Sequence, residues 1–252
     1  MNALVYGTPR LQFDVVTSTN DLARVWAQRG IGAGALVTAG SQTRGRGRRG
    51  HGWIDEPGQS AIMTFIGAPG TAIESAWRVP FAASLAAWRT VSAFGVEDAR
   101  TKWPNDVLAG DRKITGVLVE MVPIGDAGAT PLIGIGINVG QREFADCGNF
   151  VWPPASLYQA TGGRNIPPET VIARVASELS ATMALLDTWA GWASLMDEWG
   201  GAMLTGITQS GRTKDGVLAT GTLRRVRAED GAGLIEVAGG ETVAIWPDDG
   251  AI

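Results

Sequence analysis

Hydrophobic and polar residues alternate along several short stretches of this chain, and the alternation predicts strands. In residues 10–16, Leu11, Phe13 and Val15 alternate with polar neighbours, as in a strand with one face toward a core. Residues 35–40 and 60–66 are mostly apolar, which is typical of buried strands. The first part of the chain is therefore predicted to contribute three strands.

A spacing of three and four residues between apolar positions predicts helices. Leu22, Val25 and Trp26 have this spacing after the capping residues at 17–21, and Gly30 is a typical stop signal. A second helix is predicted to begin at Pro80 and to end near Gly95. Further helices are predicted after Pro167, with a shorter helical stretch that continues to about Trp199.

The stretch 101–121 predicts a turn followed by a hairpin. A strand enters at Lys102, Pro104 and Asn105 form a turn, and residues 110–112 form a hairpin turn into a long strand that starts at Lys113. Residues 131–140 predict another central strand. Beyond Gly200, short strands at 217–226, 234–237 and 243–246 are divided by glycine turns. The pattern predicts a larger domain over residues 1–199 and a small all-β domain over 200–252.

Composition narrows the class of protein. The chain has 252 residues, of which 45% are hydrophobic and 18% charged, so it can form a substantial core. It has no apolar run of roughly 18 residues and no signal-like start, so we expect no membrane span and a cytoplasmic protein. Its one cysteine, Cys147, excludes an internal disulfide. A net charge of −4 argues against a general nucleic-acid binder.

The positive charge is concentrated in one loop, residues 41–53. It contains four arginines and the only histidine, His51, among four glycines, with no acid between them. Glycine allows close approach of the main chain, and arginine binds carboxylate and phosphate oxygens, so we expect an anion site. The alternative is a solvated, disordered loop, and we expect disorder without ligand because nothing is evident for it to pack against. Gly45, Gly47 and Gly50 match a dinucleotide-binding fingerprint, but no helix start follows them.

Other polar residues are candidates for the same site. The chain has only three lysines, and Lys102 and Lys113 are predicted at strand ends that face one another across a hairpin. Gly116 would allow another backbone or a ligand to approach a strand closely. Residues 18–20, Ser-Thr-Asn, either cap a helix only or also bind a polar ligand group. By its position alone, Asn138 is better explained as a polar residue at a strand end.

These residues favour chemistry by positioning and charge. The chain lacks the nucleophile elbow of hydrolases, the phosphate-binding P-loop and the zinc-binding H-E-x-x-H pair. Several cations around a glycine-rich loop suit the joining of two anions, such as a carboxylate and a nucleoside triphosphate. The site is therefore predicted to catalyse such an activation.

Five motifs, in order over about residues 10–140, resemble those of the biotin protein ligases. They are Ser18-Thr19-Asn20; Gln42-Thr43 with the loop through Trp53; Lys102-Trp103-Pro104-Asn105-Asp106; Arg112-Lys113 with Gly116, Leu118 and Glu120; and Gly134 to Val139. The resemblance implies an α+β fold with a mixed sheet and flanking helices, like that of class II aminoacyl-tRNA synthetases, and a small C-terminal SH3-like β-barrel. Because the first strand begins at residue 10, we expect a short form without a DNA-binding domain.

The resemblance also implies an ATP-dependent ligase with Mg²⁺. It would convert biotin to biotinyl-5'-AMP and then transfer biotin to a lysine of a biotin carboxyl carrier domain. Lys113 and Arg48 would be catalytic. The implied biotin-binding residues are Ser18, Thr19, Asn20, Gln42, Gly45, Arg46, Gly47, Arg48, Lys113 and Gly116. The implied nucleotide-binding residues are Arg46, Arg48, Arg49, Trp53, Lys102, Asn105, Asp106 and Asn138.

Two features depart from the family pattern, and two alternative functions remain. His51 stands where the family commonly has arginine, and the run from Gly221 to Arg227 follows the pattern poorly. The alternatives are a lipoate ligase or acyltransferase of the same fold, and a biotin-binding protein without catalysis. The sequence leaves open the particular acceptor and whether the chain is a monomer or a homodimer.

Overall fold

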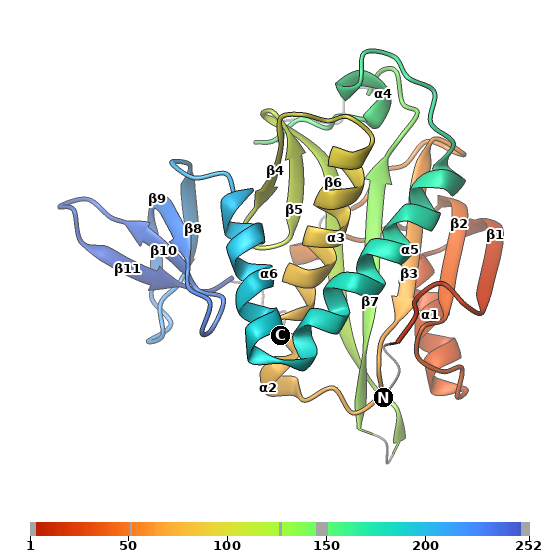
Figure 1. The fold of residues 1–252 in the computed structure, drawn as a ribbon, viewed down its shortest axis with the longest axis horizontal. Coiled ribbons are helices and arrows are strands. Elements are labelled where there is room, and N and C mark those ends of the chain that lie inside the picture. The colour runs from red at the N-terminus through yellow and green to blue at the C-terminus, as the bar shows by residue number, and fades with distance from the viewer. Residues whose placement is uncertain (1–3, 51, 126–127, 145–150, 248–252) are drawn as a thin grey trace.

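The chain folds around two β-sheets, in a computed structural model that describes residues 4–50, 52–125, 128–144 and 151–247 (Figure 1). The strands are β1 (Arg10–Val16), β2 (Leu36–Gln42), β3 (Ser60–Ile66), β4 (Ala99–Lys102), β5 (Asp106–Ala109), β6 (Arg112–Pro123), β7 (Ala129–Asn138), β8 (Thr208–Arg212), β9 (Leu218–Val226), β10 (Gly233–Glu236) and β11 (Thr242–Ile245). The helices are α1 (Thr19–Gln28), α2 (Ile73–Ala76), α3 (Val79–Ala93), α4 (Leu157–Ala160), α5 (Pro168–Ala184) and α6 (Trp189–Gly201). Single 3-10 turns are η1 (Arg48–Gly50) and η3 (Leu185–Asp187).

The larger sheet has seven strands in the order β1-β2-β3-β7-β6-β5-β4. β1 and β2 are parallel and all other neighbours are antiparallel, which confirms the predicted mixed sheet. The hairpin between β5 and β6 turns at Gly110, which has a φ of 57°. Glycine adopts this left-handed conformation without the steric cost of a side chain.

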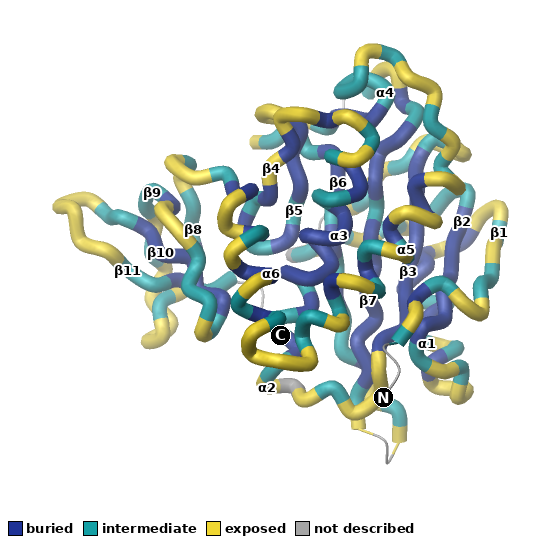
Figure 2. Tube along the Cα trace, in the orientation of Figure 1, coloured by how far each residue is buried: buried dark blue, intermediate teal, exposed yellow. Residues whose placement is uncertain are grey.

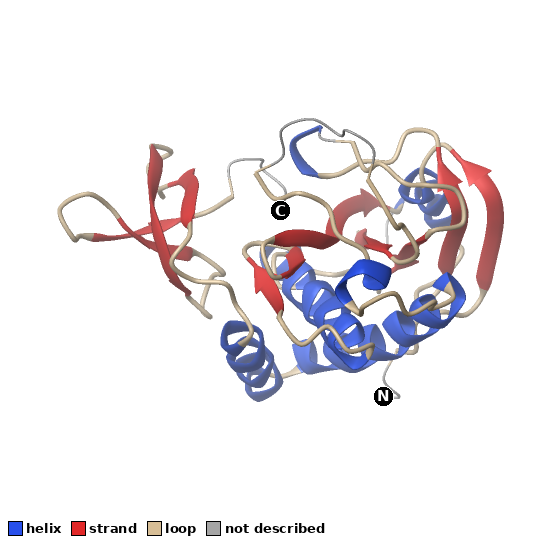
Figure 3. Ribbon diagram, turned by 90° about the horizontal axis from the view of Figure 1, so that it is seen from above, coloured by secondary structure: helices blue, strands red, loops and turns tan. Residues whose placement is uncertain are grey.

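Helices cover both faces of this sheet. α3 and α5 lie on one face and α1 on the other (Figures 1 and 3). Ile133, Ile135 and Ile137 of β7 belong to the buried cluster that includes residues of α3 and α5, whereas Ala23 and Ala27 of α1 belong to a separate buried cluster. The buried strands in the centre of Figure 2 result from this two-sided cover. No helix in the described part of the chain is both long and apolar enough to cross a bilayer.

The smaller sheet, in the order β11-β10-β9-β8, packs beside α6 through a tryptophan-rich cluster (Figure 1). The Trp103 indole N–H donates to the carbonyl of Gly231 at 3.0 Å, and that of Trp192 donates to the carbonyl of Ala228 at 2.8 Å. The predicted closed barrel is not found: among the described residues, a single bridge links Arg212 of β8 to Trp246, the residue after β11. A continuous ladder of hydrogen bonds would be needed for closure.

Gly200 provides a test of the helical assignment of α6. It is exposed, and a Cβ added to it would meet no heavy atom within 4 Å. Because glycine loses more backbone freedom on folding than alanine, Gly200→Ala is expected to raise the free energy of unfolding by about 0.5–1 kcal/mol. Urea denaturation measures this change, and a decrease would contradict it.

Candidate functional site

The floor of the candidate site consists of glycines on β6 and β7. Side chains alternate across a strand, so the isoleucines at 133, 135 and 137 face α3 and α5 while Gly134 and Gly136 face away from those helices. Gly136 pairs with Gly116 across the two strands. A side chain at these positions would collide with Asn20 or with the Trp53 ring. The glycines therefore let the side chains of Asn20 and Trp53 approach the sheet closely.

A cavity of about 620 Å³ lies over this floor. Its walls come from the start of α1, the loop after β2, the turn between β4 and β5, and the smaller sheet. Most of the predicted site residues line it: Ser18, Thr19, Asn20, Gln42, Arg46, Gly47, Arg48, Trp53, Lys102, Asn105, Asp106, Lys113, Gly116 and Asn138. The structure thus brings together residues from segments that are far apart in the chain.

The polar residues at the start of α1 are buried beside the floor. Ser18, Thr19 and Asn20 are only 3–4% exposed. Ser18 is the N-cap residue of α1, yet its side chain makes no capping hydrogen bond, so capping alone does not account for it. Gln42 accepts a hydrogen bond from the Thr19 backbone N–H at 2.8 Å. Such prearranged polar groups suit recognition of a polar ligand.

The basic loop has definite contacts, so the expectation that it has nothing to pack against is wrong for its described residues. The Trp53 N–H donates to the Gly45 carbonyl at 2.9 Å, and Arg46 and Gly52 form an antiparallel bridge. Arg48 donates to the side-chain oxygen of Asn105 at 2.9 Å. The only helical segment in the described part of the loop is η1, which confirms that no dinucleotide-binding helix follows the glycines.

Arg46 makes ion pairs with two acids of the protein. Its guanidinium lies 2.7 Å from Asp21 and 3.3 Å from Glu120. Partial burial favours the neutral form, but hydrogen bonds and the charges of these two acids outweigh that effect and raise the pKa of Arg46. The arginine therefore stays charged and its guanidinium is directed at the protein.

Asp55 accepts hydrogen bonds from the backbone N–H of the cavity-lining Gln42 and makes a pH-dependent contribution to stability. Burial raises the pKa of Asp55, although hydrogen bonds from Ser41 and the Gln42 N–H oppose that effect. Because the folded-state pKa exceeds the unfolded-state pKa, ionisation of Asp55 disfavours the folded state, and stability from this group falls as the pH rises from about 3.8 through the raised pKa.

Asp55→Asn removes this ionisation. The free energy of unfolding of the variant, relative to the wild type, is therefore expected to increase between about pH 4 and pH 7. Urea denaturation of both proteins at several pH values measures the difference. A difference independent of pH would show that Asp55 does not titrate as described.

Lys113 and Lys102 approach the same carboxylate, and this corrects the expectation that they face one another across a hairpin. Lys113 Nζ lies 2.8 Å from one oxygen of Asp106, and Lys102 Nζ lies 3.9 Å from the other. Among the described residues that line the cavity, Arg46, Arg48, Lys102 and Lys113 carry positive charge and Asp106 alone carries negative charge. This excess of cations favours an anionic ligand.

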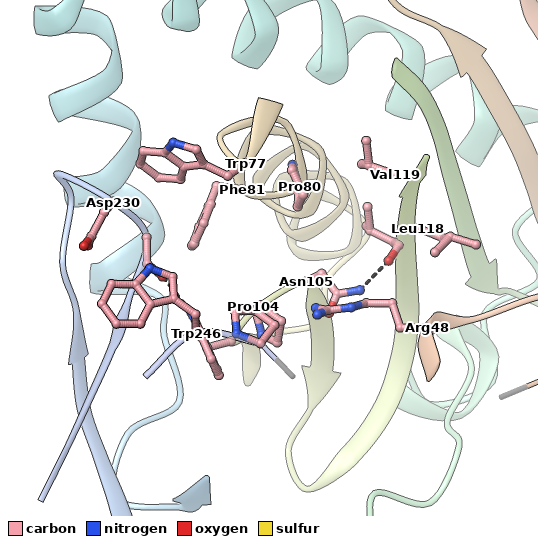
Figure 4. A pocket seen from close by; sticks show the side chains of 14 residues that line it. Arg48, Trp77, Pro80, Phe81, Pro104, Asn105, Leu118, Val119, Asp230 and Trp246 are labelled. Atoms are coloured by element: carbon pink, nitrogen blue, oxygen red, sulfur yellow. Dashed lines mark hydrogen bonds between the residues drawn. The ribbon is translucent and has the colours of Figure 1, made fainter. Parts of the chain in front are cut away.

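A smaller cavity of about 100 Å³ adjoins the larger one and shares Arg48 and Asn105 with it (Figure 4). Figure 4 shows these two side chains beside each other, with Phe81 and Pro80 across from Pro104. Asn105 donates from its amide to the carbonyl of Val117. This bond holds Asn105 against β6 while its oxygen accepts from Arg48.

Several predicted residues have other placements. Gly45 does not line the cavity; it is close to the Trp53 backbone, where a Cβ would lie 2.6 Å from the carbonyl oxygen. Asn138 is both a strand-end residue and part of the lining, and it donates to the carbonyl of Ala155 at 2.9 Å. His51 and Cys147 lie outside the described residues, as does the side chain of Arg49.

Sequence reasoning missed part of the lining. The missed residues include Phe144, Trp152, Thr208, Gln209, Ser210 and Pro247. Trp152 had a detectable signal, because a tryptophan directly before two prolines is unusual in a loop, and Lys102 Nζ lies 6.0 Å from its ring centre. The short polar stretch 208–210 carries no signal that separates it from any surface strand.

The fold and the site together define a protein with a cation-rich cavity over a glycine floor. Residues 12–138 match the model of the biotin/lipoate A/B protein ligase family. The biotin–[acetyl-CoA-carboxylase] ligase of Paracoccus denitrificans is 32% identical over 173 residues, which cover 68% of this chain and 71% of that protein. The chain belongs to the biotin/lipoate A/B protein ligase family.

Other relatives differ in length or are more distant. The bifunctional ligase/repressor BirA of Bacillus spizizenii is 33% identical over 160 residues, which cover 63% of this chain and 49% of BirA. This chain thus spans about half the length of that relative. A solved structure of the biotin protein ligase from Aquifex aeolicus in complex with biotin and ATP has a TM-score of 0.80 at 24% identity, with 96% of this chain and 97% of that chain covered. That likeness confirms the fold.

Proposed function

We propose that this protein is an ATP-dependent biotin protein ligase. The observation that carries the proposal is that Lys113, Arg48 and the polar residues 18–20 line one cavity. The cations suit a carboxylate and a triphosphate, and the buried hydroxyl and amide groups suit the polar head of biotin. The names of the Paracoccus and Aquifex relatives support biotin as the acid.

In the first proposed step, the carboxylate of biotin attacks the α-phosphorus of ATP. A P–O bond forms, the bond to the pyrophosphate oxygen breaks, and biotinyl-5'-AMP remains in the cavity. Lys113 and Arg48 reduce repulsion between the two anions and stabilise charge on the phosphoryl oxygens. The catalytic role belongs to these two residues, while Ser18, Thr19, Asn20 and Gln42 hold biotin.

In the proposed complex, the triphosphate lies at the side of the cavity that carries Lys102, Asn105 and Asp106. Mg²⁺ commonly binds phosphate oxygens together with one or two carboxylates, and Asp106 is an acid positioned for that role. No group of three or more potential metal-binding side chains occurs among the described residues.

In the second proposed step, a lysine amine of a biotin carboxyl carrier domain attacks the acyl carbon of biotinyl-5'-AMP. An amide bond forms, AMP leaves with the bonding electrons, and the amine loses a proton. We also infer that residues 1–199 form the catalytic domain and 200–252 a smaller β domain. The smaller domain contributes Thr208, Gln209, Ser210 and Pro247 to the cavity wall.

Exchange of labelled pyrophosphate into ATP tests the first step, with biotin, lipoate or no acid added. Exchange that requires biotin is the expected result. Exchange with lipoate alone would assign the chain to lipoate activation instead. Absence of exchange with either acid would contradict adenylation and favour a binding protein without catalysis.

A further inference from the structure

Arg46 makes ion pairs with Asp21 and Glu120, neither of which lines the cavity. It comes from the basic loop, whereas its partners Asp21 and Glu120 belong to α1 and β6. Both partner elements are anchored in buried clusters, through Ala23 and Val122. The ion pairs therefore tie the loop to two fixed points of the fold.

Glu120 also orients a ligand-facing residue. The Asn20 amide nitrogen donates to Glu120 at 2.7 Å, and the Asn20 oxygen lies 2.6 Å from the Thr64 hydroxyl. An ionised carboxylate only accepts hydrogen bonds, so it requires Asn20 to turn its NH₂ group toward it. Arg24 lies 3.3 Å from the other oxygen of Glu120. One carboxylate thus connects the loop to the group that faces the ligand.

Fixing Arg46 constrains the rest of the loop. The Arg46–Gly52 bridge and the bond from the Trp53 N–H to Gly45 hold the two arms of the loop together. The Trp53 ring lies against the glycine floor: a Cβ on Gly136 would come within 2.7 Å of it. A loop held in this way keeps Trp53 over the cavity.

We propose that Asp21 and Glu120 are positioning residues that hold the basic loop closed through Arg46, so that biotinyl-5'-AMP is retained between the two steps. The inference rests on the proposed function, because only an activated intermediate needs such retention. A mixed anhydride is readily hydrolysed, and a closed loop excludes water from it. Arg46 then acts on the loop, and Arg48 and Lys113 act on the ligand.

The strength of the ion pairs suits a contact that opens in each catalytic cycle. The side chains of Arg46, Asp21 and Glu120 are 38%, 42% and 26% exposed, and pairs of this kind contribute modestly. Each is expected to change the loop equilibrium by about two- to fivefold. A fully buried pair would hold the loop too firmly for the acceptor lysine to enter.

The test compares Asp21→Asn, Glu120→Gln and the double variant with the wild type. The amide introduced by Glu120→Gln retains an oxygen that can accept from Asn20, so this substitution removes mainly the charge. Glu169→Gln is the matched control, because it removes an acid that pairs with Arg10 of β1 at 2.7 Å, outside the loop contacts. Two rates are measured: release of preformed labelled biotinyl-5'-AMP, and tryptic cleavage within residues 44–49 in the absence of any substrate.

Each single variant is expected to accelerate both rates by about two- to fivefold, and the double variant by roughly tenfold, with Glu169→Gln unchanged. The acceleration of the variants relative to the wild type should decrease at high salt, because salt also weakens the exposed ion pairs of the wild type. Rates equal to those of the wild type would overturn the inference. A wild-type protein that forms no adenylate would instead refute the proposed function, while the tryptic assay would still test the loop contacts.

Discussion

Replacing Lys113 with alanine is expected to reduce adenylate formation by about 10²- to 10³-fold, the largest loss of any single substitution here. The ammonium of Lys113 lies in the cavity, 2.8 Å from Asp106. Without it, one cation fewer offsets the repulsion between the carboxylate and the triphosphate in the proposed attack. Asp106 also loses its nearer cationic partner, so its carboxylate adds to that repulsion. Biotin-dependent pyrophosphate exchange measures the effect.

A control variant separates this effect from a general loss of positive charge. Lys214 is exposed in the turn after β8, so Lys214→Ala removes the same charge away from the cavity and should exchange at the wild-type rate. Circular dichroism verifies that Lys113→Ala retains the fold. Activity of Lys113→Ala within about threefold of wild type, roughly 0.7 kcal/mol in the barrier, would show that Lys113 has no catalytic role.

The central elements of the fold could be predicted because their signals are local. Residues 10–16 and 60–66 match β1 and β3 at both ends, since side-chain period and flanking turn residues are properties of a short window. β8 was missed. Its residues, Thr-Gln-Ser-Gly-Arg, have no apolar alternation, and the strand exists because its backbone pairs with β9. Such pairing depends on a distant segment that no local pattern reveals.

The residue types of the candidate site could be predicted, but their partners could not. A loop with four arginines indicated an anion site, yet Arg46 is directed at Glu120, 74 positions away. The hydrogen bond from the Gln42 N–H to Asp55 could not be predicted either, because it depends on how the loop folds back toward the sheet. Ion pairs between distant segments depend on the folded geometry, so charge alone could place Arg46 at the cavity but could not identify its acidic partners.

Gly134, in the glycine floor, leaves no room for a side chain. A Cβ at this position would lie 2.5 Å from the Asn20 side-chain oxygen and 3.1 Å from the Leu118 carbonyl. In Gly134→Ala, Asn20 must therefore move and give up its bonds to Glu120 and Thr64. Losing an oriented polar contact costs about 1–3 kcal/mol, so KM for biotin is expected to rise roughly tenfold or more, with a smaller change in kcat.

A double-mutant cycle tests whether the increase in KM for biotin is caused by displacement of Asn20. In an Asn20→Ala background the oxygen that meets the new methyl group is absent, so Gly134→Ala should add little to the increase in KM. Gly200→Ala is the control for the substitution itself, because a Cβ there meets nothing within 4 Å. Additive effects of the two cavity substitutions would contradict this account, because they would mean that Gly134 acts on biotin without displacing Asn20.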